Sequence, residues 1–340
     1  MTHDHALALS FAPSLPRVGL TDRLRADDPL LVELAATFLP RAVDAREAAA
    51  RRGVRTVAWN DAEFPPHLLT LSDAPPALWY RGTLSCLARP GVALVGARAA
   101  SRVALDIAHR LGADLAARGV TVVSGLARGV DSAAHRGALT TGRTAAVLGG
   151  GVCEVYPSEH AALAAEIAAT GVVVSEFPPG TPPLPHHFPM RNRLISGLAR
   201  VVVVVEAAEK SGSLITAGCA LEQGREVMAV PGSVQYGRNR GGHALIRDGA
   251  KIVETVDDIV GELQGGAPLV PGGEPGSTLD ASSSSGLLLL SVMVPGEPYD
   301  LDALIAASGL DGPAALRAMT DLELAGLVQR TGAGCCIRVS

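Results

Sequence analysis

Two segments of the chain combine several arginines with histidine, glycine and asparagine and contain no acidic residue. The segment 185–200 (PHHFPMRNRLISGLAR) carries three arginines and two histidines and runs directly into five valines. The segment 235–247 (QYGRNRGGHALIR) carries three more arginines. Guanidinium groups bond phosphate oxygens bidentately, so a strip of arginines suits an extended phosphodiester chain better than one compact nucleotide. These residues predict a binding site for a polyanion.

Small and polar residues follow five of the apolar segments, in the loops 96–101, 124–129, 149–151, 175–177 and 206–213. In an open parallel sheet such loops meet at the carboxyl ends of the strands, where glycine backbones and helix N-termini attract anions. Arg98, Arg128 and Lys210 lie in these loops and are expected at the same rim. In any single loop the glycine could serve only a tight turn, but five converging loops favour a phosphate-binding rim.

The hydrophobic pattern indicates the elements that position these loops. Short valine-rich segments alternate for the most part with amphipathic segments, of which 102–119 and 159–171 have helical length. Strands that are apolar on both faces and alternate with helices are typical of a doubly wound parallel sheet. We therefore expect an extended Rossmann-like α/β fold. Its strands are expected at 92–96, 120–124, 144–150, 172–176, 201–207 and 226–232.

Composition divides the chain into four parts. Residues 1–87 are expected to form a small helical domain that ends in a proline-rich extended strap. Residues 88–264 are the Rossmann-like core, and 265–286, rich in glycine, proline and serine, is typical of a flexible linker. Residues 287–340 have the order of elements of a winged helix.

The composition also excludes several classes of protein. The chain has 340 residues, of which 48% are apolar and 19% charged, enough to bury a globular core. Its net charge of −5 excludes a uniformly basic nucleic-acid binder but permits a local basic site, because charges are screened beyond about 10 Å. No apolar run reaches the roughly 20 residues of a membrane span, and the N-terminus shows no secretory signal. Five cysteines without a CxxC pair indicate a reduced, cytoplasmic protein with no metal or other cofactor.

The fingerprints of nucleotide-binding enzymes are missing from the expected strand ends. The first turn reads GARAAS instead of G-x-G-x-x-G, the second strand ends in Ser124 without an acidic residue, and no Walker A loop occurs. Phosphoribohydrolases with this type of sheet use a Pro-Gly-Gly-x-Gly-Thr loop, and the loop after the fifth strand lacks that glycine pair. A nucleotide-binding or nucleotide-hydrolysing Rossmann enzyme remains the alternative hypothesis.

Other groups of reactive residues favour structural roles. Asp131 and His135 are four residues apart and could form a relay or a metal pair, but we favour Asp131 as a helix cap and His135 as a packed histidine. Ser124 has no candidate base and lies in no G-x-S-x-G elbow. His186 and His187 lack a partner at metal-ligand spacing. The sequence therefore predicts no catalytic residue and no metal site.

Ordered motifs between residues 61 and 257 resemble the DNA-processing protein A (DprA, or Smf) family of bacteria. They are FPPHLLTLSDAPPALWYRGTL, VALVGARAAS, SGLARGVDSAAHRGAL, AAVLGGGVCEVYPSEH, VVSEFPPG, FPMRNRLISGLA, VVVEAAEKSGSLITAGCALEQGREVMAVPG and HALIRDGA. The resemblance implies an extended Rossmann core, often preceded by a SAM-like helical domain and followed by a winged helix. It implies a cytoplasmic homodimer, not an enzyme, that binds incoming single-stranded DNA during natural transformation. Such a protein protects the DNA and loads the RecA recombinase onto it, with single-strand binding protein as a further partner.

The resemblance also implies where DNA is contacted, most directly at the turn with Gly96 and Arg98 and in the loop that contains Phe188. Family members usually have Ser or Thr at the position of Ala97, so one hydroxyl contact is missing here. They also have Asn where this chain has His243, and Tyr-Gly after the Ser101 region, where this chain has Val-Ala. None of these differences removes a cation. The expected DNA-binding residues are Gly96, Arg98, Ser101, Arg128, His187, Phe188, Arg191, Asn192, Arg193 and Lys210.

Three alternatives stay open within this hypothesis. Phe188 is placed to stack on a base, but it could equally fill the core. Arg193 could contact DNA, or it could brace the loops from beneath by pairing with Glu176 or Glu206. The C-terminal part, with a short helix ending at Gly309 and a longer one from Pro313, could bind duplex DNA. Because that longer helix carries one arginine against two acidic residues, we expect it to serve protein interaction or a weak accessory role.

Overall fold

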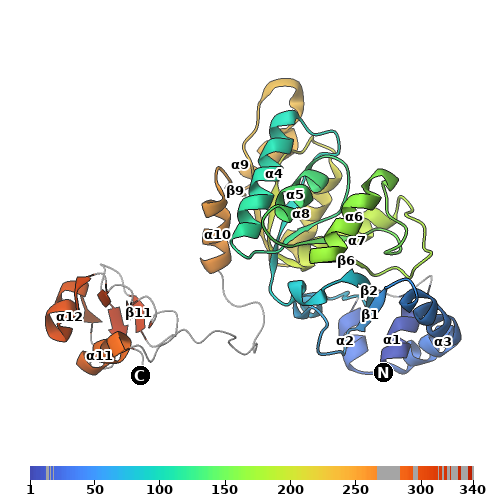
Figure 1. The fold of residues 1–340 in the computed structure, drawn as a ribbon, viewed down its shortest axis with the longest axis horizontal. Coiled ribbons are helices and arrows are strands. Elements are labelled where there is room, and N and C mark those ends of the chain that lie inside the picture. Colours follow the sequence, from blue (N-terminus) through green and yellow to red (C-terminus); the bar gives the residue numbers. More distant parts are fainter. Residues whose placement is uncertain are drawn as a thin grey trace. The chain divides into compact units, whose positions relative to one another are not determined.

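The structure is a computed structural model of the chain, which divides into two compact units, Met1–Val270 and Pro271–Ser340 (Figure 1). The domain boundaries expected at residues 87, 264 and 286 stay predictions. No helix among the residues described is long and apolar enough to cross a membrane. The structure describes residues 1–265 apart from 13, 14, 16 and 18, and in the C-terminal part 284–293, 298–312, 314, 315, 318, 319, 322, 328–330 and 336–338.

A nine-stranded sheet forms the centre of the first unit. Its strands are β1 (Arg55–Ala58), β2 (Ala77–Gly82), β3 (Gly91–Val95), β4 (Val122–Ser124), β5 (Thr144–Val147), β6 (Val172–Ser175), β7 (Ala199–Val204), β8 (Glu226–Ala229) and β9 (Lys251–Ile252). They lie in the order β1-β2-β6-β5-β4-β3-β7-β8-β9. From β6 to β9 every neighbouring pair is parallel. This confirms the expected Rossmann-like α/β fold.

The sheet is mixed, however, because β2 pairs antiparallel with both β1 and β6. The expected strap thus ends in a strand of the sheet, which corrects the expectation of a purely parallel sheet. Strand β2 is held in the sheet because the side chains on both of its faces are buried. Leu78 and Tyr80 join the core of the α/β sheet on one side, while Ala77 and Trp79 join the core of the N-terminal helices on the other.

Helices cover both faces of the sheet. The helices on one face are α4 (Arg102–Ala117), α5 (Val130–Leu139), α6 (Ala161–Thr170) and α10 (Val256–Gly265), and those on the other are α7 (His187–Gly197) and α8 (Gly212–Glu222). The spacing of apolar residues explains this placement: Ala104, Ala108, Leu111 and Leu115 form one buried stripe of α4. The helix α9 (Arg240–Arg247) packs next to β8. Short 3₁₀ helices lie at Pro66–Thr70, Leu84–Leu87, Ser158–His160 and Gln235–Gly237.

Three helices precede the sheet in the first unit. They are α1 (His3–Leu9), α2 (Leu20–Arg25) and α3 (Pro29–Ala50). The side chain of Asp28 accepts a hydrogen bond from the Leu30 N–H at 2.9 Å and so caps α3, which begins with a proline. The buried faces of the three helices pack together with Trp79 of β2. The expected helical N-terminal part is therefore present and shares its core with the edge of the sheet.

The second unit contains α11 (Ser284–Val292), β10 (Pro298–Tyr299), α12 (Leu301–Ser308), β11 (Val328–Arg330) and β12 (Cys336–Arg338). Its three strands form an antiparallel sheet in the order β10-β12-β11. Asp300 caps α12 by accepting from the Ala303 N–H at 2.6 Å, and Gly309 ends it with φ +70°. The helix expected from Pro313 and the expected linker lie largely outside the described residues.

Candidate nucleic-acid interface

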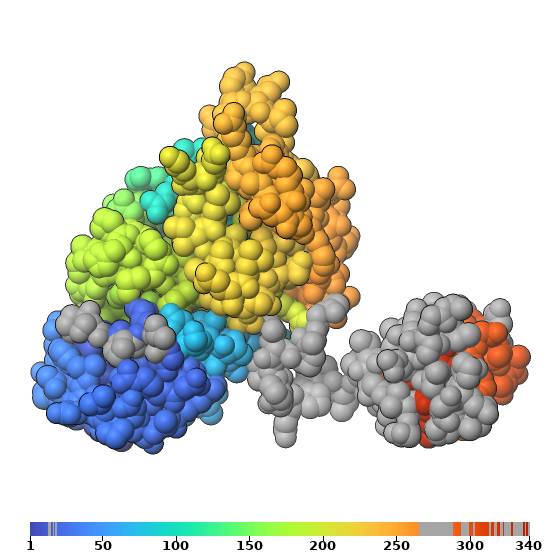
Figure 2. Space-filling view, turned by 180° about the vertical axis from the view of Figure 1, so that it is seen from behind, coloured from blue at the N-terminus to red at the C-terminus, as the bar shows by residue number. Residues whose placement is uncertain are grey.

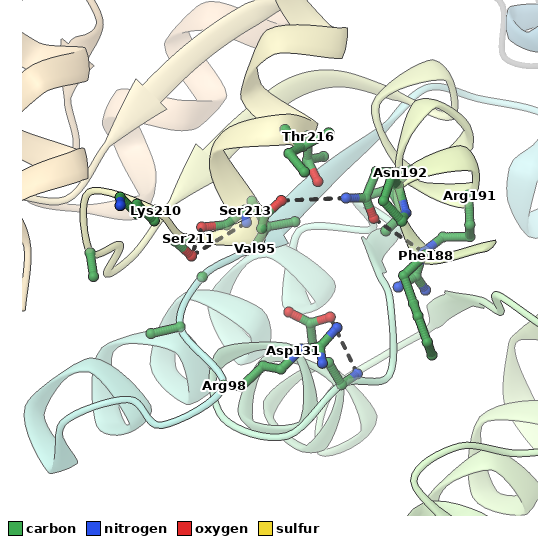
Figure 3. A pocket seen from close by; sticks show the side chains of 18 of the residues that line it. Val95, Arg98, Asp131, Phe188, Arg191, Asn192, Lys210, Ser211, Ser213 and Thr216 are labelled. Atoms are coloured by element: carbon green, nitrogen blue, oxygen red, sulfur yellow. Dashed lines mark hydrogen bonds between the residues drawn. The ribbon is translucent and has the colours of Figure 1, made fainter. Parts of the chain in front are cut away.

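The strand order reverses between β3 and β7, which are neighbours in the middle of the sheet. The chain proceeds to β4, β5 and β6 on one side and to β8 and β9 on the other. Open α/β sheets bind ligands in the crevice at such a switch point. A pocket of about 660 Å³ lies here, between the turn after β3, the start of α7 and the loop before α8 (Figure 3). Of the expected DNA-binding residues, Gly96, Arg98, Phe188, Arg191, Asn192 and Lys210 line it.

The end of β7 holds the turn after β3 in place. The Ala97 N–H donates to the Glu206 carbonyl oxygen at 2.7 Å. A Cβ atom on Gly96 would lie 2.6 Å from a methyl group of Val130, at the start of α5. Glycine is therefore required for β3, α5 and β7 to approach each other so closely.

The same turn positions Arg98. The Ser101 N–H donates to Glu206 Oε1 at 2.9 Å, and Ser101 Oγ accepts from the Ala104 N–H at 3.2 Å, which caps α4. The side chain of Ser101 is thus engaged by the helix, while Arg98, between these two fixed points, is exposed. Arg98 is free to reach a ligand at the mouth of the pocket.

Two aromatic rings accompany Arg98. The Arg98 guanidinium carbon lies 5.4 Å from the centre of the Phe188 ring, and the Phe188 ring lies 5.7 Å from that of Tyr156. Phe188 is half-buried and Tyr156 is 47% exposed, so both rings have faces or edges available to a base. Tyr156 was missed in the sequence because its loop carries no cation; its Tyr-Pro pair after three glycines was the signal that could have indicated it.

Arg191 forms part of the pocket floor and is only 3% exposed. Its Nη1 donates to the Gly125 carbonyl oxygen at 2.8 Å and to that of Val147, so it links the ends of β4 and β5. A Cβ atom on Gly125 would lie 2.6 Å from Nη1. Burial lowers the pKa of Arg191 to about 10, so the guanidinium remains charged at neutral pH. Its positive charge therefore adds to the positive electrostatic potential at the floor of the pocket.

Asp131 holds the loop before α5 and does not cap the helix. The N-cap position is Gly129, and the Asp131 carboxylate in the first turn accepts from the N–H groups of Gly125 (3.1 Å) and Ala127 (3.3 Å). The expectation of a cap was wrong because the preceding loop folds back over the carboxylate. Burial raises the pKa of Asp131, while nearby Arg191 opposes that rise. His135 is fully buried, which confirms it as a packed histidine.

Asn192 and Lys210 lie on the side of the pocket formed by α8. Asn192 Nδ2 donates to the Gly212 carbonyl oxygen at 3.4 Å, which links α7 to the first residue of α8. Ser211 Oγ caps α8 by accepting from the Ser213 N–H at 3.4 Å. Lys210, directly before this cap, is exposed. The positive end of α8, the Lys210 ammonium and Arg98 therefore border the same pocket (Figure 3).

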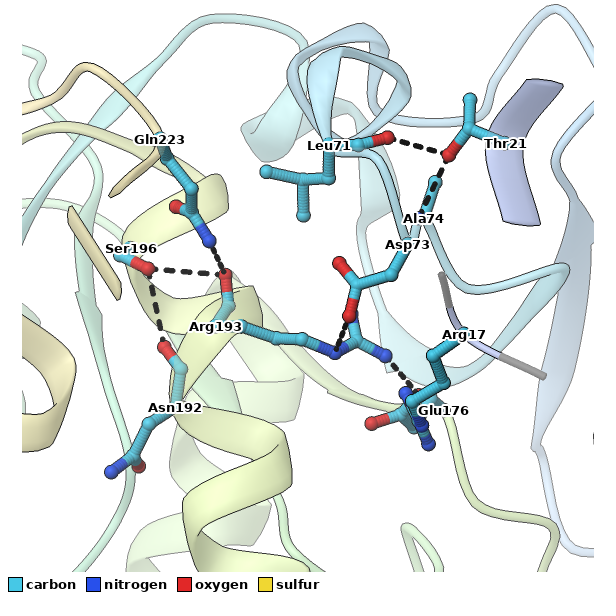
Figure 4. A network of polar contacts seen from close by, with 10 residues as sticks. All are labelled: Arg17, Thr21, Leu71, Asp73, Ala74, Glu176, Asn192, Arg193, Ser196 and Gln223. Carbon is cyan, nitrogen blue, oxygen red and sulfur yellow. Dashed lines mark hydrogen bonds and ion pairs between the residues drawn. The ribbon is translucent and has the colours of Figure 1, made fainter. Parts of the chain in front are cut away.

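Arg193 points to the opposite side of α7, toward the N-terminal helices (Figure 4). Its Nη2 donates to Glu176 Oε2 at 2.6 Å, and its Nε lies 3.0 Å from Asp73 Oδ2. Arg17 Nη1 bonds the same Glu176 oxygen at 3.1 Å. The hypothesis that Arg193 braces the loops through Glu176 is confirmed, whereas Glu206 holds the turn after β3.

Two further expected residues lie near the pocket with partners of their own. Arg128 forms a bidentate pair with Glu159, at 2.7 and 2.8 Å, and lines a small adjoining hollow of about 70 Å³ with Arg98 and Phe188. His187 is buried and stacks on Phe177, with 4.2 Å between the ring centres. Burial lowers the pKa of His187, with His186 adding to the shift. Arg128 is thus partly neutralised, and His187 supports the start of α7.

These features define a class of protein. An open α/β sheet with a cationic and aromatic pocket at its switch point is suited to binding a nucleic-acid strand rather than to acid–base chemistry. The chain belongs to the DNA recombination-mediator protein A family, whose sequence model matches residues 55–264. A second model, the DprA winged helix domain, matches residues 276–334 and confirms the expected winged helix. The family is one of recombination mediators, which agrees with the prediction that the chain is not an enzyme.

Relatives from several bacteria are similar over most of the chain. Protein Smf of Escherichia coli is 42% identical over 280 residues, covering 81% of this chain and 75% of that protein. The DNA processing protein DprA of Streptococcus pneumoniae is 44% identical over 202 residues, covering 59% of this chain and 71% of that protein. Its crystal structure matches with a TM-score of 0.67 at 35% identity, over 77% of this chain and 98% of the other. DNA processing protein A of Helicobacter pylori, whose structure concerns its single-stranded DNA binding mode, matches with a TM-score of 0.56 at 27% identity, over 62% and 95% of the two chains.

Proposed function

We propose that this chain binds single-stranded DNA in the pocket at the switch point and acts as a recombination mediator during natural transformation. The observation that carries the proposal is the grouping of Arg98 with the Phe188 and Tyr156 rings at the mouth of a pocket that Lys210 also lines. Cations meet the phosphates and the rings stack on bases, which is the combination that single strands require. Family membership and the single-strand binding of the H. pylori relative support it.

The expected site residues divide into two roles under this proposal. Arg98, Phe188 and Lys210 contact the strand through side chains that are exposed or half-buried, and Gly96 contributes the turn. Arg128 is a peripheral contact because it must share its guanidinium with Glu159. The other residues hold these groups in place. They are the half-buried Ser101 and the buried His187, Arg191, Asn192 and Arg193, with Arg191 and Asn192 also reaching the pocket surface.

The direct test is Arg98→Ala, assayed by oligothymidine binding at several salt concentrations. We expect weaker binding and a salt dependence whose slope falls by about one, because one phosphate contact is lost. Arg110→Ala is the matched control, since Arg110 is an exposed arginine on the same stretch of chain, two turns into α4. If the Arg98→Ala protein binds oligothymidine like the unmodified chain at every salt concentration, the switch-point pocket is not the DNA-binding site.

We further propose, from the family, that the protein is a cytoplasmic homodimer that protects the strand and loads RecA onto it, with single-strand binding protein as a further partner. The measurement is the rate of RecA filament formation on DNA coated with single-strand binding protein, with and without this chain. An acceleration that Arg98→Ala abolishes supports loading. Turnover of a nucleoside monophosphate would instead favour the alternative, a Rossmann nucleotide enzyme.

A further inference from the structure

The loop between β8 and α9 exposes a large aromatic side chain outside the pocket. Tyr236 is 92% exposed, and its neighbour Val234 is 84% exposed. The loop stands out from the first unit beyond the ends of the strands, at the top of Figures 1 and 2. Exposed rings are rare in this chain, in which aromatic residues make up only 3%. Tyr236 and Val234 therefore place an aromatic and an aliphatic side chain together in water at the tip of one loop.

The tip of the loop holds the ring in an unfavourable backbone conformation. Tyr236 has φ +60°, a left-handed value that is uncommon for a bulky residue, and Gly237 follows with φ +68°. The Gln235 N–H donates to Ser233 Oγ at 3.1 Å, which tightens the turn before it. Strained conformations persist where the surrounding structure enforces them, and they concentrate at ligand-binding positions.

The base of the loop is anchored to the two strands next to the pocket. Asn239 is 2% exposed; its Oδ1 accepts from the Ala207 N–H at 3.0 Å and its Nδ2 donates to the Val230 carbonyl oxygen at 3.1 Å. A Cβ atom on Gly232 would lie 2.5 Å from that Nδ2. The loop therefore rises from the carboxyl ends of β7 and β8 on a fixed base. Its tip is held in one place relative to the rim.

The loop is also continuous with the cationic rim. Arg238 Nη1 donates to the carbonyl oxygen of Ala99 at 3.3 Å, one residue after Arg98. The chain from Val230 to Arg247 contains no acidic residue, and it contributes Arg240 beside the tip. A strand that leaves the pocket past Arg98 therefore meets Arg238 and Arg240 on the way to Tyr236, with Glu209 as an acidic neighbour of Arg240.

We propose that Tyr236 is a second stacking site for single-stranded DNA, which receives a base of the strand outside the switch-point pocket. Stacking on a tyrosine ring accepts any base, so the site would lengthen the bound segment without adding sequence preference. The proposal rests on the proposed function, because it extends the same DNA track. Arg238 and Arg240 supply the phosphate contacts on either side of the stacked base.

The test compares Tyr236→Ala with the unmodified chain on a thymidine oligomer of roughly 20 nucleotides and on an oligomer of the same length that lacks bases. We expect Tyr236→Ala to bind the thymidine oligomer about tenfold more weakly, with an unchanged salt slope, and to bind the abasic oligomer as the unmodified chain does. Tyr236→Phe should keep the affinity because the ring remains. Val234→Ala, in the same loop and similarly exposed, is the matched control and should have no effect.

A direct signal comes from Tyr236→Trp, whose emission should be quenched when thymidine oligomer is added. The inference is overturned if the unmodified chain binds DNA and Tyr236→Ala binds equally well. It is also overturned if Tyr236→Ala changes the oligomeric state instead, since the loop then contacts a second copy of the chain. The proposed function fails in a different way, namely if the unmodified chain binds neither oligomer.

Discussion

Three consecutive residues of α7, Arg-Asn-Arg, have three different environments, although all three carry polar side chains that can donate hydrogen bonds. Arg191 lies under the pocket against the carbonyl oxygens of β4 and β5, and Asn192 reaches the start of α8. Arg193 turns away to Asp73 and Glu176. Successive helical residues are separated by about 100°, so neighbours in the sequence face different parts of the molecule. Only Arg191 and Asn192 contribute to the pocket surface.

Arg193→Met is expected to destabilise the protein by about 3–5 kcal/mol, because it leaves the buried Glu176 carboxylate without its closest cation. The measurement is the free energy of unfolding in urea. Arg193→Lys should recover part of the lost stability. It restores the positive charge, but its single ammonium group cannot reproduce the guanidinium geometry that pairs with both Asp73 and Glu176. If the Met variant is as stable as the unmodified chain and has lost only DNA affinity, Arg193 is a DNA contact after all.

The sequence could predict which residues gather at the rim, but not how deeply each is buried. Arginines next to apolar strands indicated a site, and the order of the strand-end loops brought Gly96, Arg98, Phe188 and Lys210 together as expected. The exposed fraction of a side chain depends on what packs behind it. For Arg193 one of the two acidic partners, Asp73, lies 120 residues away in the chain, in a segment whose place beside the sheet the sequence did not reveal.

At the scale of the element, the six predicted strands are present, but β5, β7 and β8 each end three residues earlier than expected. Leu148, Val205 and Val230 continue the apolar pattern past the strand ends and are buried all the same. They are the first residues of the loops that follow β5, β7 and β8, and they extend the core beyond the strand ends. Strand β2 was missed because a pair of prolines comes directly before it, yet those prolines lie outside the strand and leave its hydrogen bonds intact.

The packing of α5 against β5 predicts a specific dependence of stability on pH. Thr144 Oγ1 donates to the Val122 carbonyl oxygen at 2.7 Å, so the His135 Nδ1–H donates to Thr144 Oγ1, also at 2.7 Å. Burial lowers the pKa of His135 to about 3, and the positive charges of His160 and Arg191 add to the effect. In the unfolded chain the histidine takes up a proton near pH 6.5. The stabilisation from the neutral histidine is therefore complete above pH 6.5 and is lost as the pH falls toward about 3.

We expect this loss to approach about 1.4 kcal/mol per pH unit within that window, measured as the free energy of unfolding. His135→Gln cannot be protonated and should lack this part of the slope, although carboxylates elsewhere still contribute to both proteins. Equal slopes for the two proteins between pH 6 and pH 4 would show that His135 is not the group responsible.

At the scale of the whole molecule, the chain contains two units that can be tested separately. The residues that line the pocket, those of the Tyr236 loop and those of the Arg193 cluster all belong to Met1–Val270. A fragment of residues 1–270 is expected to unfold cooperatively and to bind oligothymidine within about 0.5 kcal/mol of the full chain. Calorimetry and a binding titration check this. A fragment that folds but has lost most of its affinity would assign a DNA contact to the winged helix.

The antiparallel pairing of β2 with β6 has a consequence for how the chain can be shortened. The core expected at residues 88–264 begins after β2, so a fragment with those bounds would leave β6 as the last strand of the sheet. The residues of β6 are three valines and a serine, and their free N–H and C=O groups would form a flat, uncharged edge. Such an edge recruits the same strand from other molecules. The N-terminal part thus protects the protein from strand pairing between molecules at this edge, and fragments that retain it will remain in solution where the isolated core precipitates.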